Sequence, residues 1–141
     1  MVETVSVRMS FPGGRKVLAR VGEHTVLTDQ PRARGGEDEA PSPYRLFLAS
    51  IGACVGYYAL VFCQSRDISC EGLEVYGDFQ TENGTLVGAE LHIRPPVGFP
   101  EKYRDAILRS VDQCTVKRSI QARPDIRIHL ERPAEEPSLH H

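Results

Sequence analysis

Four cysteines are the residues of this sequence best suited to chemistry: Cys54, Cys63, Cys70 and Cys114. A thiolate is both a nucleophile and a metal ligand, so these residues point to redox or metal chemistry. The spacing argues against a metal, because no Cys-x-x-Cys occurs and no His lies three to five residues from a Cys. We therefore expect no metal site and no bound cofactor. Redox-active thiols and inert core thiols both stay open.

Cys54 lies inside a long apolar segment that has the features of a helix. Ser42 is a favourable N-cap and Pro43 a favourable first helical residue. Residues 46–63 contain one polar residue besides two tyrosines, and as a helix they would be about 27 Å long, just short of a bilayer core. The many Gly and Ala residues and the central tyrosines favour a helix buried by protein on nearly all sides. A chain of 141 residues is too small to cover it alone, so we expect a second subunit.

The positions of the other three cysteines follow from the elements expected around them. Cys63 lies nine residues after Cys54, which on one helix places the two on opposite faces and excludes a bridge between them. Cys70 lies at the junction between this helix and the next strand, and Cys114 at the end of an amphipathic helix over 101–114. Cys54, Cys70 and Cys114 therefore belong to different parts of the predicted fold.

The remaining pattern predicts short elements on both sides of the long helix. We expect strands over 5–9, 16–21 and 25–27 in a meander, a turn at 11–14, a solvated polar loop over 29–43, a hairpin of 73–80 and 86–93 around an Asn-Gly turn, a short helix over 117–122, and a last strand containing Ile126 and Ile128. This order predicts the α+β class. We expect one domain over 1–132 and a polar tail over 133–141, in which His140 and His141 have the look of a tag remnant.

The composition limits the classes of partner that the protein could bind. The formal net charge is −2, with 40% apolar and 26% charged residues. No basic surface is therefore available for a phosphate backbone, and we expect no nucleic-acid partner. The first residues lack a basic stretch followed by an apolar run, which predicts a cytoplasmic protein with no membrane association and with reduced thiols.

Three segments carry a family resemblance. Gly13-Gly14-Arg15 precedes the long helix, the helix start has the pattern Pro43-x-x-Leu46-(x)7-Cys54, and a later segment reads Cys-x-Val-x-x-Ser-Ile over 114–120. Together they resemble the OsmC/Ohr family of thiol-dependent hydroperoxide reductases, over roughly residues 3–130. The resemblance implies an OsmC-like intertwined homodimer, in which two central helices lie back to back and sheets from both subunits wrap them.

The resemblance also implies a reaction. A Cys54 thiolate would reduce organic hydroperoxides or hydrogen peroxide and become a sulfenic acid, which Cys114 would convert to a disulfide. An external thiol or dithiol reductant would then restore both thiols. Cys54 lies about three turns inside its helix, beyond the reach of the helix dipole, so we expect a cation to lower its pKa. The family motif points to Arg15 as this cation, with Arg20 as the fallback.

The sequence departs from the hydroperoxide-reductase branch at one place. That branch has a Glu directly after the helix-starting Pro, where it holds the catalytic Arg; here the positions are Tyr44 and Arg45. The acidic residues at 37–39 are candidates to replace it. The departure predicts a divergent branch of the family. Cys63 and Cys70 have no counterpart in the family motif, and we interpret them as structural or incidental. The alternative function is a non-enzymatic OsmC-like protein that binds a small apolar ligand beside Cys54.

Overall fold

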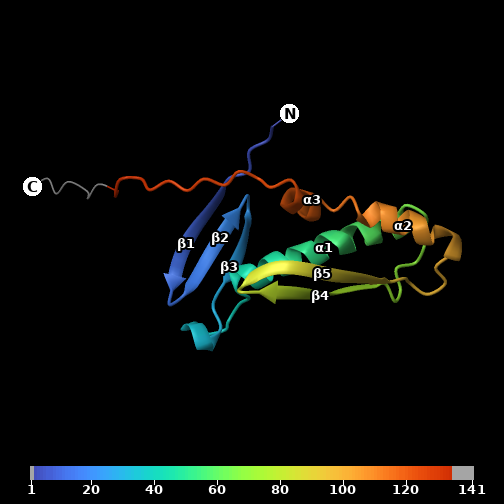
Figure 1. The fold of residues 1–141 in the computed structure, drawn as a ribbon, viewed down its shortest axis with the longest axis horizontal. Coiled ribbons are helices and arrows are strands. Elements are labelled where there is room, and N and C mark those ends of the chain that lie inside the picture. Colours follow the sequence, from blue (N-terminus) through green and yellow to red (C-terminus); the bar gives the residue numbers. More distant parts are fainter. Residues whose placement is uncertain (1, 135–141) are drawn as a thin grey trace, which may run out of the picture.

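The computed structural model describes residues 2–134. In chain order, its elements are β1 (Val7–Gly13), β2 (Lys16–Val21), β3 (His24–Thr28), the 3-10 turn η1 (Arg32–Arg34), α1 (Pro43–Gln64), β4 (Glu74–Glu82), β5 (Thr85–Arg94), the 3-10 turn η2 (Glu101–Tyr103), α2 (Arg104–Val111) and α3 (Thr115–Gln121). Figure 1 shows α1 as the long central helix, with the β4–β5 hairpin along one side and α2 and α3 along another. The predicted α+β class is confirmed.

The N-terminal sheet is the predicted antiparallel meander, in the order β1-β2-β3. The predicted turn at 11–14 is wrong in its first half, because β1 continues to Gly13 with a shifted register after Ser10. Pro12 is tolerated there because β1 is an edge strand and needs no N–H at that point. The sheet lies beside the first turns of α1 and leaves a cavity of about 370 Å³ between them, lined by Met9 and Phe47 among others.

α1 begins as the sequence predicts. The Ser42 hydroxyl accepts a hydrogen bond from the backbone N–H of Arg45 at 3.3 Å, and Pro43 is the first helical residue. The buried face has helical spacing and consists of Ile51, Val55, Ala59, Phe62 and Cys63. Within the single chain, the hairpin, α2 and α3 cover only this face, so one chain does not cover the helix on all sides, as expected from its size. The opposite side is open to solvent, with Tyr57 59% exposed.

The length and apolar composition of α1 also satisfy the criteria for a membrane-crossing helix, which core helices of soluble proteins satisfy as well.

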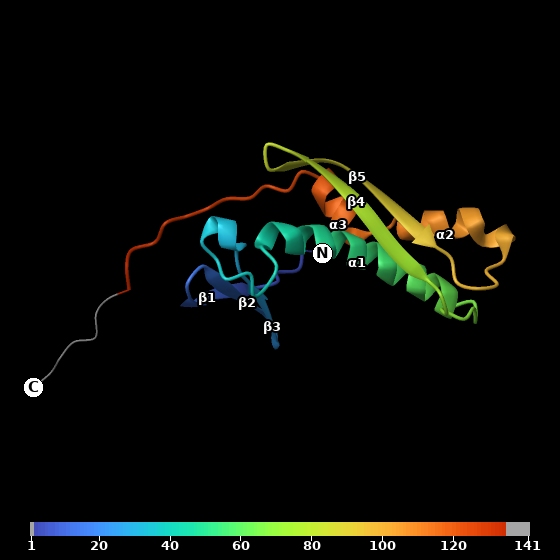
Figure 2. The same cartoon turned by 90° about the horizontal axis from the view of Figure 1, so that it is seen from below.

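The β4–β5 hairpin has the predicted Asn-Gly turn. Asn83 and Gly84 both have positive φ, 53° and 77°, as a two-residue type I′ turn requires. Val75 and Ile93 are paired across the strands and pack against the core at the end of α1. Seen from below, the hairpin crosses α1 obliquely (Figure 2).

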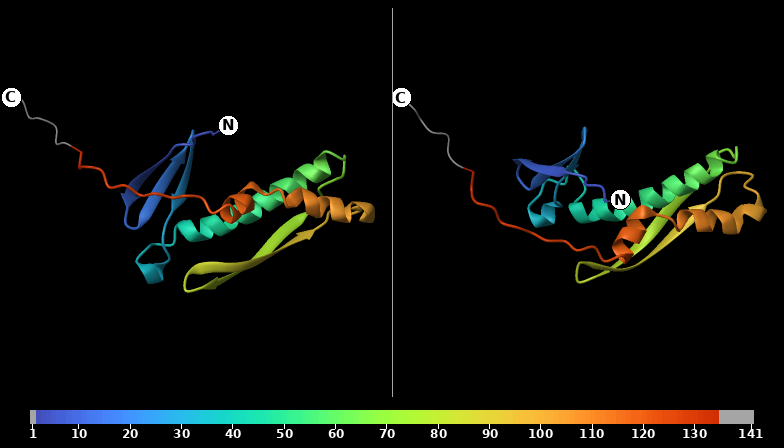
Figure 3. Two further views of the ribbon diagram at one scale, coloured as in Figure 1. Left: turned by 45° about the horizontal axis from the view of Figure 1, so that its top comes forward. Right: turned by 90° about the horizontal axis from the view of Figure 1, so that it is seen from above.

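The C-terminal third differs from the sequence prediction in two places. The helix expected over 101–114 is η2 followed by α2, which ends at Val111, so that Cys114 becomes the N-cap of α3. The strand expected at Ile126 and Ile128 does not form; residues 123–134 run extended away from α3 without a strand partner in the described chain (Figure 3). A strand needs another edge to supply its hydrogen bonds, and this chain offers none there. Ile126 and Ile128 are accordingly 78% and 93% exposed.

The core is small and lies at the C-terminal end of α1. Ala59, Phe62, Cys63 and Ile107 form its buried cluster. The Phe62 ring lies 5.9 Å from the Tyr103 ring in an edge-on arrangement. This cluster fixes the end of α1 against α2 and the hairpin, and leaves Cys54 in the less covered middle of the helix.

Candidate active site

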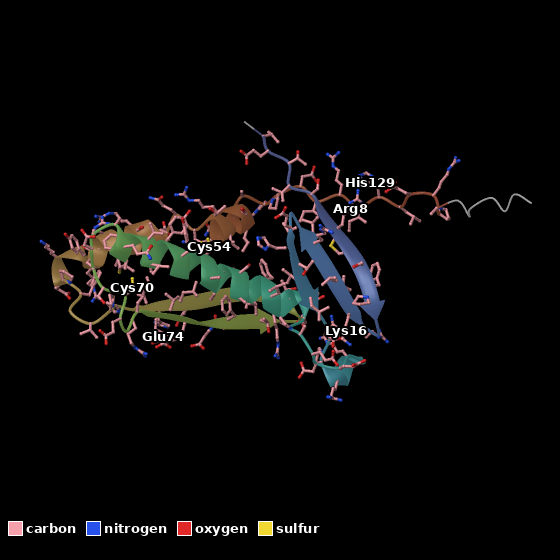
Figure 4. The ribbon with its side chains drawn as sticks, turned by 180° about the vertical axis from the view of Figure 1, so that it is seen from behind. Arg8, Lys16, Cys54, Cys70, Glu74 and His129 are labelled. Atoms are coloured by element: carbon pink, nitrogen blue, oxygen red, sulfur yellow. The ribbon has the colours of Figure 1, made fainter. Side chains whose placement is uncertain are left out.

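α1 and the α2–α3 junction together position two thiols. Cys54 lies half-buried in the middle of α1, beside α3 (Figure 4). Cys114, at the N-cap of α3, is fully buried. Each of the two thiols shifts the pKa of the other, so the sulfurs are neighbours. Cys54 is the sulfur that a small solute reaches from solvent, and Cys114 is sheltered behind it.

The environment of Cys54 favours its thiolate. Burial by itself would raise the pKa of Cys54, but the backbone N–H of Val116, the Cys114 thiol and the backbone N–H of Thr115 face the sulfur and together hold this pKa below its ordinary value. These N–H groups belong to the first turn of α3, where they have no partner within the helix. Another helix thus supplies donors to Cys54 that the sequence, from which we expected a cation, did not reveal.

Cys114 has the opposite electrostatic character. Burial raises its pKa, and the neighbouring Cys54 raises it further, against the backbone N–H of Lys117. That N–H donates to the Cys114 sulfur at 3.5 Å. The pKa values of the two thiols are therefore shifted in opposite directions, that of Cys54 downward and that of Cys114 upward.

Two side-chain contacts hold α3 over Cys54. The Tyr58 hydroxyl, one turn after Cys54 on α1, lies 3.5 Å from the Thr115 hydroxyl. Lys117 forms an ion pair with Asp112 across the turn that carries Cys114, and Lys117 lowers the pKa of the Asp112 carboxyl. Sequence reasoning missed both contacts. The Cys54–Tyr58 spacing of four residues was the only signal, since it places both side chains on one helix face.

Arg15 does not lie near Cys54 in this chain. Its guanidinium Nε lies 3.4 Å from the position that a Cβ on Gly35 would occupy. Lys16, the next residue, lies well away from Cys54 in Figure 4. Glu37 and Glu39, two of the acids considered as partners for Arg15, bind Lys16 instead, at 3.2 and 3.3 Å. The structure thus brings Cys54 and Cys114 together and leaves Arg15 apart from them.

A buried carboxylate that the sequence did not reveal organises the loop between β3 and α1. Asp29 is 1% exposed, and its two oxygens accept the backbone N–H groups of Gln30, Glu37 and Glu39 at 2.7, 3.2 and 3.1 Å. Burial by itself would raise the pKa of Asp29, but these three donors outweigh it and the pKa is lowered. The loop is therefore an ordered segment, where the sequence predicted a solvated connector.

Within residues 2–134, no cluster of three or more His, Cys, Asp and Glu has the arrangement of a metal site. The thiol pair stands by itself at the junction of α1 and α3.

Comparison with known proteins places this architecture in a family. The family model of OsmC-like proteins matches residues 36–129, which include Cys54 and Cys114. The chain belongs to the OsmC family. No curated protein matches the chain.

Solved structures of OsmC-family proteins share the fold at low sequence identity. An OsmC-like protein of Mycoplasma pneumoniae is 16% identical, with a TM-score of 0.65 over 87% of this chain and 91% of the other. The organic hydroperoxide resistance protein OsmC of Legionella pneumophila is 21% identical, with a TM-score of 0.59 over 86% and 91%. An organic hydroperoxide resistance protein of Elizabethkingia anophelis is 22% identical, with a TM-score of 0.60 over 87% and 91%. At these identities the similarity establishes the OsmC fold.

Proposed function

We propose that this OsmC-family protein is a thiol peroxidase that reduces organic hydroperoxides or hydrogen peroxide. The observation that carries the proposal is the pair formed by Cys54 and Cys114, in which the accessible sulfur has the lowered pKa and the buried sulfur the raised one. Two structural neighbours that are named organic hydroperoxide resistance proteins support the same class of reaction. We place the protein in the cytoplasm, where thiol reductants keep such a pair reduced.

The proposed catalytic cycle needs only these two residues, the hydroperoxide and one external reductant. The Cys54 thiolate attacks one peroxide oxygen, the O–O bond breaks, and the alkoxide leaves and takes up a proton as the alcohol. Cys54 is then a sulfenic acid. The Cys114 sulfur attacks it, the S–S bond forms, and the hydroxyl leaves with the Cys114 proton as water. A thiol or dithiol reductant returns the disulfide to two thiols by exchange.

We further propose that the working form is a homodimer. The chain exposes 11803 Å², whereas a folded monomer of its mass exposes roughly 7,300 Å². The flank of α1 beside the start of the hairpin forms an open trough of about 520 Å³, lined by small and apolar residues that include Gly52, Gly56 and Val75. The extended residues 123–134 also lack a strand partner within the described chain. A second copy would cover the trough and offer sheet edges for this segment.

One equivalent of cumene hydroperoxide should convert the protein to a form with a single Cys54–Cys114 disulfide. Non-reducing tryptic mapping should then find the peptide 46–66 joined to the peptide 110–117, because Cys54 and Cys114 are neighbours in the native chain. The first peptide also contains Cys63, so Cys63→Ser is the matched control and should give the same linked pair. A bridge that contains Cys63 or Cys70 at one equivalent would refute the assignment.

Replacing Arg15 by Ala should slow peroxide reduction and move the alkylation profile of Cys54 to higher pH. The wild-type profile should have its midpoint below the ordinary value of about 8.5, because the pKa of Cys54 is lowered. Since Arg15 lies against Gly35 in its own chain, this proposal requires a second copy to bring Arg15 to the thiolate. Loss of that cation should raise the midpoint by about one pH unit, which is about tenfold less thiolate at neutral pH.

Arg20→Ala is the control and should leave the alkylation midpoint where it is. Light scattering should show the Arg15→Ala protein to be as dimeric as the wild type. An unchanged alkylation midpoint in Arg15→Ala would mean that the N–H groups of α3 suffice and that Arg15 has no part in activation.

A further inference from the structure

The end of α1 holds two further thiols that the proposed reaction does not use. Cys63 lies in the last turn of α1 and is fully buried. After the helix the chain doubles back, because the backbone N–H of Ile68 donates to the Cys63 carbonyl at 2.9 Å. Cys70 follows, half-buried, and packs against the core cluster to which Cys63 belongs. Figure 4 shows Cys70 beside this end of α1.

The segment around Cys70 is fixed in place by backbone hydrogen bonds. The N–H of Leu73 donates to the Cys70 carbonyl at 3.0 Å, and the N–H of Val97 donates to the Glu71 carbonyl at 2.9 Å. Together with the bond from Ile68 to Cys63, they attach this segment to the end of α1 and to the residues after β5. Cys70 is therefore held beside the end of α1, where Cys63 lies.

A charged residue, Arg66, lies at the same end of α1 as these two cysteines. The Arg66 guanidinium lies 3.6 Å above the Phe62 ring and donates to the Phe62 carbonyl at 3.3 Å and to the Ser65 hydroxyl at 3.1 Å. Burial raises the pKa of Cys63, Cys70 raises it further, and Arg66 lowers it. Cys63 in the last turn of α1, Arg66 just after the helix, and Cys70, which packs against the cluster that contains Cys63, therefore gather at one end of α1.

We propose that Cys63 and Cys70 are a second redox-active thiol pair, which a hydroperoxide oxidises to an intramolecular disulfide. Cys70 is the more exposed sulfur and meets the oxidant first: its sulfur takes one peroxide oxygen, the O–O bond breaks and the alcohol leaves. Cys63 then attacks the sulfenic sulfur, the S–S bond forms, and water leaves with the Cys63 proton. Two thiols lose two electrons, and the hydroperoxide becomes alcohol and water.

This second pair acts separately from Cys54 and Cys114. Cys54 and Cys63 lie on opposite faces of α1, about 13.5 Å apart along the helix axis. Cys54 and Cys63 therefore cannot form a disulfide with each other while α1 is intact. The new disulfide would join the last turn of α1 to the residues that lead into β4, and so fasten the end of the central helix to the hairpin.

The test uses the variant in which Cys54 and Cys114 are both replaced by Ser, so that only the second pair can react. The folded variant is treated with a small excess of cumene hydroperoxide, its free thiols are blocked, and the protein is digested without reduction. Because trypsin cleaves after Arg66, between the two cysteines, a Cys63–Cys70 bridge should appear as the peptide 46–66 joined to the peptide 67–102. Its melting temperature should rise on oxidation and return with dithiothreitol.

Cys70→Ser in the same background is the matched control and should give no linked peptides. The proposal is overturned if both thiols are still alkylated after treatment, or if Cys70 proceeds to sulfinic acid while Cys63 stays free. Should the double variant fail to fold, the wild type with excess oxidant gives the same answer, because its peptide 46–66 must then be joined to both partners. The outcome does not depend on peroxide turnover by Cys54, so failure of either proposal is recognised separately.

Discussion

Cys54→Ser is expected to lower the rate of hydroperoxide reduction by at least about a thousandfold, a barrier increase of about 4 kcal/mol. The hydroxyl of Ser keeps its proton at neutral pH, whereas the α3 N–H groups already favour the thiolate of Cys54. The measurement is consumption of cumene hydroperoxide with dithiothreitol as reductant, in a Cys63→Ser background so that the proposed Cys63–Cys70 pair does not contribute.

Two companion variants separate the roles of the thiols. Cys114→Ser should consume about one equivalent of peroxide rapidly and then turn over slowly, because the sulfenic acid forms but has no partner for the disulfide. Cys63→Ser should match the wild type. If the wild type consumes no peroxide above the Cys54→Ser background, the enzymatic proposal fails and the ligand-binding alternative takes its place.

Gly56→Leu is expected to break the proposed dimer while leaving the single chain folded. No atom of this chain outside the neighbouring helix backbone lies within 4 Å of a Cβ added at Gly56, so Leu fits the isolated chain and favours the helix by roughly 0.5–1 kcal/mol. Against a second helix packed into the trough, the added side chain overpacks the contact. The dissociation constant should rise at least about a hundredfold, or about 3 kcal/mol.

Light scattering over a concentration series measures this change, and circular dichroism checks that α1 is retained. Gln64→Leu, an exposed position at the end of α1 and outside the trough, is the control and should dimerise like the wild type. A Gly56→Leu dimer as tight as that of the wild type would show that the trough is not the interface. A wild type that is monomeric at micromolar concentration would remove the dimer proposal altogether.

Local signals were sufficient for much of the fold. The start of α1 could be predicted from Ser42 and Pro43, and the hairpin from its Asn83-Gly84 turn. Helix caps and tight turns depend on the residues of the segment itself, so the sequence reports them directly. The prediction of a strand at Ile126 and Ile128 was wrong because a strand, unlike these features, depends on a partner elsewhere. Its residues have a strand pattern, but the hydrogen bonds of a strand come from another edge, which the pattern of the segment itself cannot report.

The site was predictable only in part. The family motifs indicated Cys54 and Cys114, and the structure brings them together. The contribution of the α3 backbone to the lowered pKa of Cys54 was missed, because backbone N–H groups leave no residue type in the sequence. The periodicity of α2 also extends to Cys114, which hid the break in the helix that turns Cys114 into an N-cap.

The dual position of Cys114 gives α3 a sensitivity to oxidation. The sulfur that caps the helix by accepting the Lys117 N–H is the sulfur that would enter the disulfide. The N–H groups of Thr115 and Val116, which stabilise the Cys54 thiolate, lose that negative charge once Cys54 is oxidised. The cap and the thiolate charge at the first turn of α3 are therefore features of the reduced protein. If the disulfide forms, we expect this turn to keep the Tyr58–Thr115 and Lys117–Asp112 contacts but to lose those two features, so that a reductant would meet a surface whose local order differs from that of the reduced state.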